Sequence, residues 1–270
     1  MNFLDALPDR YRLILCDIWG VVHDGFQLYP GAAERLRQFR GEGRMVVLLT
    51  NAPRTTGAIE QDVTRIGLPR DAWDAIASGG QAGIDALKQS GEPVGFLGTE
   101  EDREILLDAG LTIAESVEFT HLACTGLPNP RGKPDDYLET LRALAQRGVL
   151  LHCLNPDRVA IHGGVMEYCA GALADRFIEL GGSVEFYGKP YPAIYQHALS
   201  LAGDPPAAEV LAIGDSLQTD ILGAARMGFE AVFVMGGIHA GEPIPDDFGS
   251  SNGLGDWKPV AVVEGLQVSA

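Results

Sequence analysis

The sequence predicts an α/β protein built on a doubly wound, Rossmann-like parallel sheet. Short apolar segments alternate with amphipathic segments of helical period along most of the chain, which is typical of a parallel sheet with helices on both faces. Several of the apolar segments are followed within two residues by a carboxylate, amide or ammonium side chain. With 270 residues, the chain is long enough for a second domain beside this sheet.

The predicted elements follow one another in the order that such a sheet requires. An apolar strand at 13–16 precedes a helix at 31–41, whose apolar residues recur at helical spacing and which ends at glycine. A second strand at 45–49 precedes a helix at about 56–66. Further strands are predicted at 94–97, 122–125, 149–154, 184–187, 210–213 and 231–235, with helices between most of them.

Composition and charge argue against several classes of protein. Hydrophobic residues make up 46% and charged residues 21% of the chain, as in globular proteins, and no apolar run reaches the roughly 18 residues that a membrane span needs. The formal net charge of −17, without a basic cluster, argues against nucleic acid or an anionic membrane as partner. The first residues lack a secretory signal pattern, and the four cysteines show no C-x-x-C spacing. We therefore expect a cytoplasmic protein with buried, reduced thiols.

Polar residues at strand ends are the candidates for a functional site. Five of them lie within two residues of the end of a predicted strand: Asp17, Thr50, Asn51, Lys189 and Asp215. Ligands of parallel sheets bind beyond the carboxyl ends of the strands. A carboxylate that attacks phosphorus, a second carboxylate that shares Mg²⁺ with it, and a hydroxyl and an ammonium that hold phosphate oxygens would together suit phosphoryl transfer.

These residues stand in four motifs that resemble those of the haloacid dehalogenase superfamily, whose members are mostly phosphatases with an aspartate nucleophile. The motifs occur in the family's order: Asp17-Ile-Trp-Gly-Val, Leu49-Thr-Asn51, Gly188-Lys-Pro190 and Gly214-Asp-Ser-Leu-Gln-Thr-Asp220. More narrowly, the chain resembles the class IIA, or NagD-like, branch, in which an α/β cap of the C2 type is inserted between the second and third motifs. The resemblance implies a core domain of residues 1–77 and 186–270 and a cap of residues 78–185.

The resemblance also implies a role for each matching residue. The catalytic and metal-binding set for Mg²⁺ is Asp17 as nucleophile and ligand, Trp19 through its main-chain carbonyl, and Asp215. The set that binds the phosphate of a small phosphorylated metabolite is Thr50, Asn51 and Lys189, and Asp220 orients Lys189 or the water ligands of the metal. Homodimers formed through the cap would match the family.

The tripeptide Gly-Lys-Pro occurs twice, so the choice between its two lysines needs a reason. Lys133 follows Asn129-Pro-Arg, which is typical of a loop, whereas Lys189 follows a predicted strand and precedes the Asp215 motif by a short helix. We therefore assign phosphate binding to Lys189 and a solvated loop to Lys133.

Four further polar residues are candidates with a simpler alternative. His23 and Asp24 follow the first motif, where the family has a flap that closes over the site, but Asp24-Gly25 is also an ordinary turn pair. Asn155 and Asp157 belong to an Asn-Pro-Asp segment that resembles the cap loop in which the family selects its substrate. A plain turn explains these two residues nearly as well.

Trp19 departs from the family pattern and leaves three interpretations open. Phosphatases of the superfamily carry an aspartate here that protonates the leaving group and then activates water, and an indole can do neither. Losing such a group costs about 10²–10⁴-fold in rate. The chain is then a Mg²⁺-dependent phosphatase in which His23, Asp24 or water replaces the acid, a phospho-ligand-binding protein without turnover, or a dehalogenase-like hydrolase that uses Asp17 on carbon.

Overall fold

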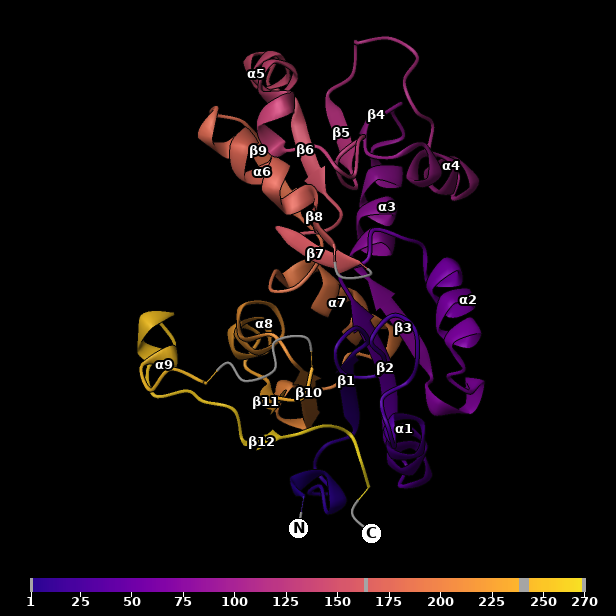
Figure 1. The fold of residues 1–270 in the computed structure, drawn as a ribbon, viewed down its shortest axis with the longest axis vertical. Coiled ribbons are helices and arrows are strands. Elements are labelled where there is room, and N and C mark those ends of the chain that lie inside the picture. Colours follow the sequence, from indigo (N-terminus) through magenta and orange to yellow (C-terminus); the bar gives the residue numbers. More distant parts are fainter. Residues whose placement is uncertain (1, 163–164, 238–242, 269–270) are drawn as a thin grey trace. The chain divides into compact units, whose positions relative to one another are not determined.

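The computed structural model describes residues 2–162, 165–237 and 243–268, which form two compact units (Figure 1). The first unit comprises Met1–Thr50, Ile59–Ala77 and Tyr195–Ala270, and the second comprises Asn51–Ala58 and Ser78–Ile194. The long segment of the second unit begins at residue 78, where the predicted cap begins, but the unit also includes residues 51–58 and 186–194. The division of the chain into a core and an inserted cap stays a prediction.

The first unit contains a six-stranded sheet in the order β12-β11-β10-β1-β2-β3 (Figure 1). Its strands are β1 (Leu13–Asp17), β2 (Met45–Thr50), β3 (Ala75–Ser78), β10 (Val210–Gly214), β11 (Glu230–Val234) and β12 (Ala261–Val263). Strand β1 pairs in parallel with both neighbours, so that Leu13 lies beside Val210 on one side and Met45 on the other. The chain winds outward from β1 in two directions, and its switch point lies between β1 and β10.

The central strands of this sheet are buried along their whole length. All five residues of β1 and all five of β10 are buried, which is why these segments are continuous apolar runs rather than alternating ones. Helix α1 directs Leu36 and Phe39 into the core, as its spacing predicted. The helices that lie wholly or mainly in this unit are α1 (Ala32–Gly41), α2 (Thr56–Ile66), α7 (Pro192–Leu201), α8 (Leu222–Arg226) and α9 (Phe248–Ser251).

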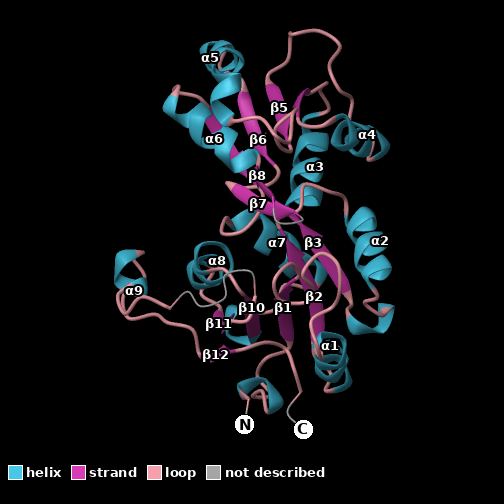
Figure 2. Cartoon of the chain, in the orientation of Figure 1, coloured by secondary structure: helices cyan, strands magenta, loops and turns pink. Residues whose placement is uncertain are grey.

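The second unit is also an α/β structure (Figure 2). It has a four-stranded parallel sheet in the order β4-β5-β6-β9 and a separate antiparallel hairpin, β7-β8 (Figure 1). Its strands are β4 (Gly95–Leu97), β5 (His121–Cys124), β6 (Leu150–Cys153), β7 (Val159–His162), β8 (Val165–Tyr168) and β9 (Ser183–Phe186). Its helices are α3 (Gly79–Ser90), α4 (Glu100–Asp108), α5 (Leu138–Gln146) and α6 (Ala170–Glu179).

Helices cover both faces of the four-stranded sheet, and the side chains of β5 alternate between the two apolar clusters that these helices form with it. Leu122 packs with Leu141 of α5 and Phe177 of α6, whereas Ala123 packs with Ile84 of α3 and Leu106 of α4. This alternation is the period-two pattern of a strand between two helical layers.

The predicted parallel α/β architecture is confirmed, and the elements that the sequence missed are short. Strands β3, β7, β8 and β12 have three or four residues each, and Val165 and Met166 of the hairpin are exposed. Segments this short are difficult to distinguish from loops or helix turns by their apolar residues alone. All four cysteines are free and buried. Within the described residues, no helix has the length and apolar character that crossing a membrane demands.

Candidate active site

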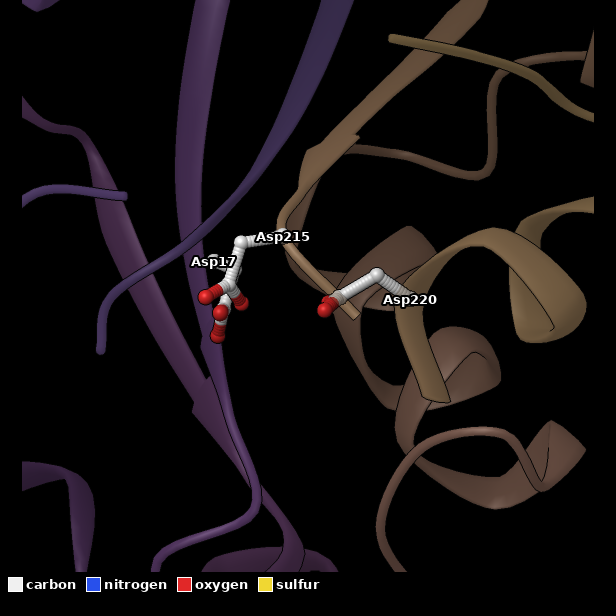
Figure 3. Close-up of side chains that lie close together, drawn as sticks. All are labelled: Asp17, Asp215 and Asp220. Atoms are coloured by element: carbon white, nitrogen blue, oxygen red, sulfur yellow. The ribbon is translucent and has the colours of Figure 1, made fainter. Parts of the chain in front are cut away.

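Three aspartates meet at the carboxyl ends of β1 and β10 in the first unit. Asp17 is the last residue of β1, Asp215 directly follows β10, and Asp220 lies in a single π-helical turn, Leu217–Ile221, that leads into α8. One carboxylate oxygen of each lies within 4.8 Å of the other two, and all three side chains are buried. Figure 3 shows the three carboxylates directed into the same small region. The structure therefore brings together the acidic residues of the first and fourth motifs, at the switch point of the sheet.

Glycines allow the carboxylates to come this close. A Cβ atom at Gly20, where φ is +92°, would overlap with Oδ2 of Asp215, and so would a Cβ at Gly237. A Cβ at Gly214 would likewise overlap with the side chain of Asp220. Sequence reasoning missed Gly237, which lies far from the motifs. The available signal was the pair Gly236-Gly237 directly after the strand predicted at 231–235, at the same edge of the sheet.

The donor set of this cluster fits a hard divalent cation. Oxygen ligands from one or two carboxylates are what Mg²⁺ takes from proteins. Buried carboxylates at such separations repel one another in their charged forms, so a bound cation stabilises them. On the chemistry of its side chains, the cluster of Asp17, Asp215 and Asp220 is the candidate metal site.

Thr50 lies at the same edge of the first unit's sheet as Asp17. Strand β2 is the neighbour of β1, with Leu49 in register with Asp17, so Thr50 is one residue beyond the pair at the carboxyl end. Its side chain is buried. The Thr50 side chain thus lies at the predicted edge of the sheet, and phosphate binding by its hydroxyl stays a prediction.

In the second unit, Asn51 and Lys189 are joined by hydrogen bonds. The main-chain N–H of Lys189 donates to Oδ1 of Asn51 at 2.6 Å, and Nδ2 of Asn51 donates to the Lys189 carbonyl at 3.1 Å. Nδ2 of Asn51 also donates to Oδ1 of Asp157 at 2.8 Å. The structure thus unites two predicted phosphate-binding residues with one residue of the predicted cap loop.

The two Gly-Lys-Pro lysines lie in contrasting environments. Lys189 is only 3% exposed. Lys133 is exposed and directly precedes a 3₁₀ turn, Pro134–Tyr137. The main-chain N–H of Lys133 donates to Oδ2 of Asp136 in this turn at 2.8 Å. The predicted solvated loop at Lys133 is confirmed by this exposure.

Trp19 packs inside the loop that follows Asp17, which we call the flap (residues 18–29). The main chain of the flap folds back on itself, because the N–H of Gly20 donates to the carbonyl of His23 at 2.9 Å. The indole ring meets the His23 ring edge-on, with centroids 5.7 Å apart. A Cβ at Gly25 would lie 2.8 Å from Cη2 of the indole. The indole therefore serves as an apolar anchor of the flap, at the third position of the first motif.

His23 and Asp24 are both fixed by main-chain hydrogen bonds. Nδ1 of buried His23 accepts from the N–H of Gly25 at 3.0 Å, which places the imidazole proton on Nε2, and burial lowers the pKa of His23. Oδ1 of Asp24 accepts from the N–H groups of Phe26 and Gln27, both at 2.9 Å, and these bonds lower the pKa of Asp24. At neutral pH the imidazole is therefore neutral and the carboxylate ionised. The turn interpretation of Asp24 agrees with these bonds.

Tyr29, at the end of the flap, is a neighbour of the site that the sequence did not reveal. Burial raises the pKa of its phenol, and the carboxylates of Asp24 and Asp215 raise it further. The phenol therefore stays protonated near Asp215. No motif or periodicity marks this tyrosine, so only the folded chain could identify it.

Asn155 and Asp157 form a turn and also reach a site residue. Oδ1 of Asn155 accepts from the N–H of Asp157 at 3.1 Å, which is an Asx turn. The carboxylate of Asp157 meanwhile accepts from Asn51. The turn interpretation of this segment is confirmed, and its role in substrate selection stays a prediction.

Comparison with known proteins identifies the family of this chain. Residues 14–112 match a family model of haloacid dehalogenase-like hydrolases, and residues 186–267 match a second model, described as HAD-hydrolase-like. Ribonucleotide monophosphatase NagD of Escherichia coli (strain K12) is 31% identical over 235 residues, which cover 83% of this chain and 88% of NagD. Glycerol-3-phosphate phosphatase of Homo sapiens is 27% identical over 267 residues, which cover 86% of this chain and 81% of that protein.

A solved structure has the same fold over the whole length. It is a haloacid dehalogenase-like hydrolase from Brucella suis 1330, with a TM-score of 0.84 and 32% identity, covering 99% of this chain and 100% of the other. The chain therefore belongs to the haloacid dehalogenase superfamily of hydrolases, as its four motifs predicted. Within that superfamily its place is among the class IIA, NagD-like phosphatases, and phosphatases of this superfamily typically use a divalent metal.

Proposed function

We propose that this protein is a Mg²⁺-dependent phosphatase that hydrolyses a small phosphorylated metabolite through an aspartyl-phosphate on Asp17. The observation that carries the proposal is the buried cluster of Asp17, Asp215 and Asp220 at the switch point of the sheet. NagD is named for ribonucleotide monophosphates and the human relative for glycerol 3-phosphate, which supports a phosphomonoester as the substrate. A cytoplasmic location and a homodimer belong to the same proposal.

The residues that would hold Mg²⁺ are Asp17, Asp215 and the main-chain carbonyl of Trp19. When bound, the ion supplies positive charge to the phosphoryl group and to the attacking carboxylate. Asp220 suits an orienting role, because its Oδ2 already accepts from the N–H of Ser216 at 3.2 Å and from the hydroxyl of Thr219 at 3.4 Å.

The proposed reaction has two displacements at phosphorus. An oxygen of Asp17 first attacks phosphorus, and the bond from phosphorus to the leaving-group oxygen breaks. Water then attacks the same phosphorus, which releases inorganic phosphate and restores the carboxylate. The Thr50 hydroxyl, the main-chain N–H of Asn51 and the Lys189 ammonium would stabilise the phosphate oxygens in both steps. We assign the main-chain N–H of Asn51 because both hydrogens of its side-chain amide are donated elsewhere.

Trp19 restricts the substrates that this reaction can use well. An alkoxide leaving group needs a proton, and the indole that packs in the flap has none to give at neutral pH. Aryl and acyl phosphates have leaving groups that depart as stable anions. We therefore propose that such esters or anhydrides are the better substrates.

The test is phosphate release from 4-nitrophenyl phosphate, acetyl phosphate and glycerol 3-phosphate, with and without Mg²⁺. Wild type should turn over the first two only with Mg²⁺, and Trp19→Asp should raise turnover of glycerol 3-phosphate by about 10²-fold. A silent wild type with an active Trp19→Asp would instead favour the second candidate function, a phospho-ligand-binding protein. Trp19 is the observation that favours that candidate.

A further inference from the structure

The side-chain amide of Asn51 has a single orientation that satisfies its partners. Oδ1 faces the N–H of Lys189, which needs an acceptor, while Nδ2 faces the Lys189 carbonyl and the Asp157 carboxylate, which both need a donor. Rotating the amide by half a turn would set its N–H groups against the N–H of Lys189 and its oxygen against two acceptors. The hydrogen-bond network therefore fixes the amide.

Asp157 is the charged member of this network, and its own position is fixed. The first turn of α6 holds the loop that carries it, since the N–H of Gly171 donates to the carbonyls of Asn155 at 3.0 Å and Asp157 at 3.1 Å. A Cβ at Gly171 would overlap with the carbonyl oxygen of Pro156. Helix and loop are thus in direct main-chain contact, and the carboxylate extends from a rigid turn.

Close packing also brings the Lys189 segment against Asn51. A Cβ at Gly188 would lie 2.5 Å from Oδ1 of Asn51 and would overlap with the ring of Pro156. Glycine at 188 therefore lets three segments meet: the one after β2, the loop after β6 and the one after β9. The hydrogen bonds from Asn51 to Lys189 form at this meeting point.

We propose that Asp157 is a positioning residue for Lys189. Its carboxylate holds the Asn51 amide, the amide holds both main-chain polar groups of Lys189, and the lysine side chain thereby starts from a fixed point. Asp157 acts through Asn51 and not by contact with the substrate. The proposal rests on the proposed function only for what the Lys189 ammonium binds, because the network exists in the folded chain without substrate.

The test measures hydrogen–deuterium exchange at the Lys189 amide by NMR in the full-length protein. Asp157→Ala should speed this exchange about tenfold, because the Asn51 amide loses a charged partner that fixes its orientation. Asp157→Asn keeps an acceptor oxygen and should speed it only about two- to threefold. The matched control is Asp175→Ala, which removes a carboxylate that pairs with Arg158, the residue after Asp157. This control should leave exchange at Lys189 unchanged.

Kinetics provide a second measurement, with inorganic phosphate as the probe. Asp157→Ala should raise KM for 4-nitrophenyl phosphate and the inhibition constant of phosphate by about the same tenfold factor, with a smaller change in kcat. Unchanged exchange at Lys189 in Asp157→Ala, or equal acceleration in Asp175→Ala, would overturn the proposal. If exchange at Lys189 is faster in Asp157→Ala but the wild type releases no phosphate, the positioning role is upheld and the proposed phosphatase activity is contradicted. If Asp157→Ala does not fold, exchange at the Lys189 amide is compared between Asp157→Asn and Asp175→Ala. Faster exchange in Asp157→Asn upholds the proposal, and equal exchange overturns it.

Discussion

Two polar clusters, a buried one in the first unit and a partly exposed one in the second, combine their hydrogen-bonding groups in opposite ways. The cluster in the first unit is the aspartate triad Asp17, Asp215 and Asp220, whose oxygens lie within 4.8 Å of one another. The cluster in the second unit is a chain of hydrogen bonds across β5, β6 and the end of β9. Nδ1 of His121 lies 2.8 Å from Nε2 of His152, and Nδ1 of His152 lies 2.8 Å from the Tyr187 hydroxyl. The Tyr187 hydroxyl donates to Oε2 of Glu185 at 2.6 Å.

The second cluster, which we call the His–Tyr–Glu chain, alternates donors and acceptors. The Tyr187 hydroxyl donates to Glu185, so its oxygen accepts from Nδ1–H of His152, and Nε2 of His152 in turn accepts from His121. Each link is satisfied with both imidazoles neutral. The aspartate triad, in contrast, gathers groups that only accept hydrogen bonds when they are ionised.

This difference in hydrogen-bonding groups indicates that the triad has a functional role and the His–Tyr–Glu chain a structural one. Crowded carboxylates repel one another when they are ionised, and a bound cation offsets that repulsion, whereas a satisfied hydrogen-bond network makes the fold more rigid. Substitutions in the triad should therefore remove activity and leave stability equal or higher. Substitutions in the His–Tyr–Glu chain should lower stability and leave the chemistry intact.

Asp17→Asn is the substitution with the largest expected effect. Phosphate release should fall by about 10⁴-fold or more, because an amide is a poor nucleophile. The melting temperature without metal should stay equal or rise, since one of three crowded charges is lost. Asp9→Asn, which changes an exposed carboxylate of the same unit, is the control and should keep the activity. A clear fall in the melting temperature of Asp17→Asn would break the comparison between the two clusters.

Lys189→Ala and Lys133→Ala extend the comparison to a repeated tripeptide. Lys189 is buried and Lys133 is exposed. We expect kcat/KM to fall by about 10²–10³-fold in the first variant, because a preorganised ammonium that stabilises phosphate charge is lost, and by less than about twofold in the second. Steady-state kinetics with 4-nitrophenyl phosphate measure both. Equal effects would mean that burial does not distinguish the functional lysine.

Gly237→Ala tests whether the main chain enforces the crowding of the triad. A Cβ at Gly237 would overlap with Oδ2 of Asp215, whereas a Cβ at Gly41, at the end of α1, would meet nothing within 4 Å. Displacing the Asp215 carboxylate should weaken Mg²⁺ affinity about 10–100-fold, as when a ligand loses its support. Calorimetric titration with Mg²⁺ measures the effect, and Gly41→Ala should bind as wild type does. Undiminished affinity in Gly237→Ala would show that Asp215 adapts freely.

The triad could be predicted from the sequence, and the His–Tyr–Glu chain could not, for a physical reason. Asp17 and Asp215 each follow an apolar strand, and parallel strands place such residues at one edge, so motif order and strand order located them. Gly237 belongs to the same edge but carries no side chain to mark its role. Its function is to leave space, which is visible only when the neighbouring carboxylate is placed.

The His–Tyr–Glu chain depends on strand register instead. His152 lies opposite Ala123 of β5 and Glu185 of β9, and only this register sets the imidazole between its partners. The sequence predicted the strands that contain these residues to within a residue or two, but a shift of one residue turns every side chain to the other face. Trp19 is a third case, because its motif position was clear and its packing in the flap was not.

The pH dependence of stability is the smallest of the expected effects and tests the second cluster. Burial, together with the neighbouring His121, lowers the pKa of His152 to about 4, although Glu185 opposes the shift. A histidine whose folded pKa lies below its unfolded value of about 6.5 stabilises the fold fully above pH 6.5, and this contribution is lost as the pH falls towards 4. Urea unfolding should therefore show that wild type loses about 1–2 kcal/mol more than His152→Asn between pH 7 and pH 5.

The sign of this pH effect on stability distinguishes the His–Tyr–Glu chain from the aspartate triad. Protonation of His152 at Nε2 would set two donors against each other at the His121 link, whereas protonation of a carboxylate in the triad relieves repulsion. Phosphate release measured at pH 7 should meanwhile differ little between wild type and His152→Asn, because the substituted residue lies outside the predicted site. Parallel loss of stability in wild type and His152→Asn would place the acid sensitivity elsewhere. A large loss of activity at pH 7 in His152→Asn would instead show that the His–Tyr–Glu chain takes part in the reaction. The contrast between a functional and a structural cluster would then fail.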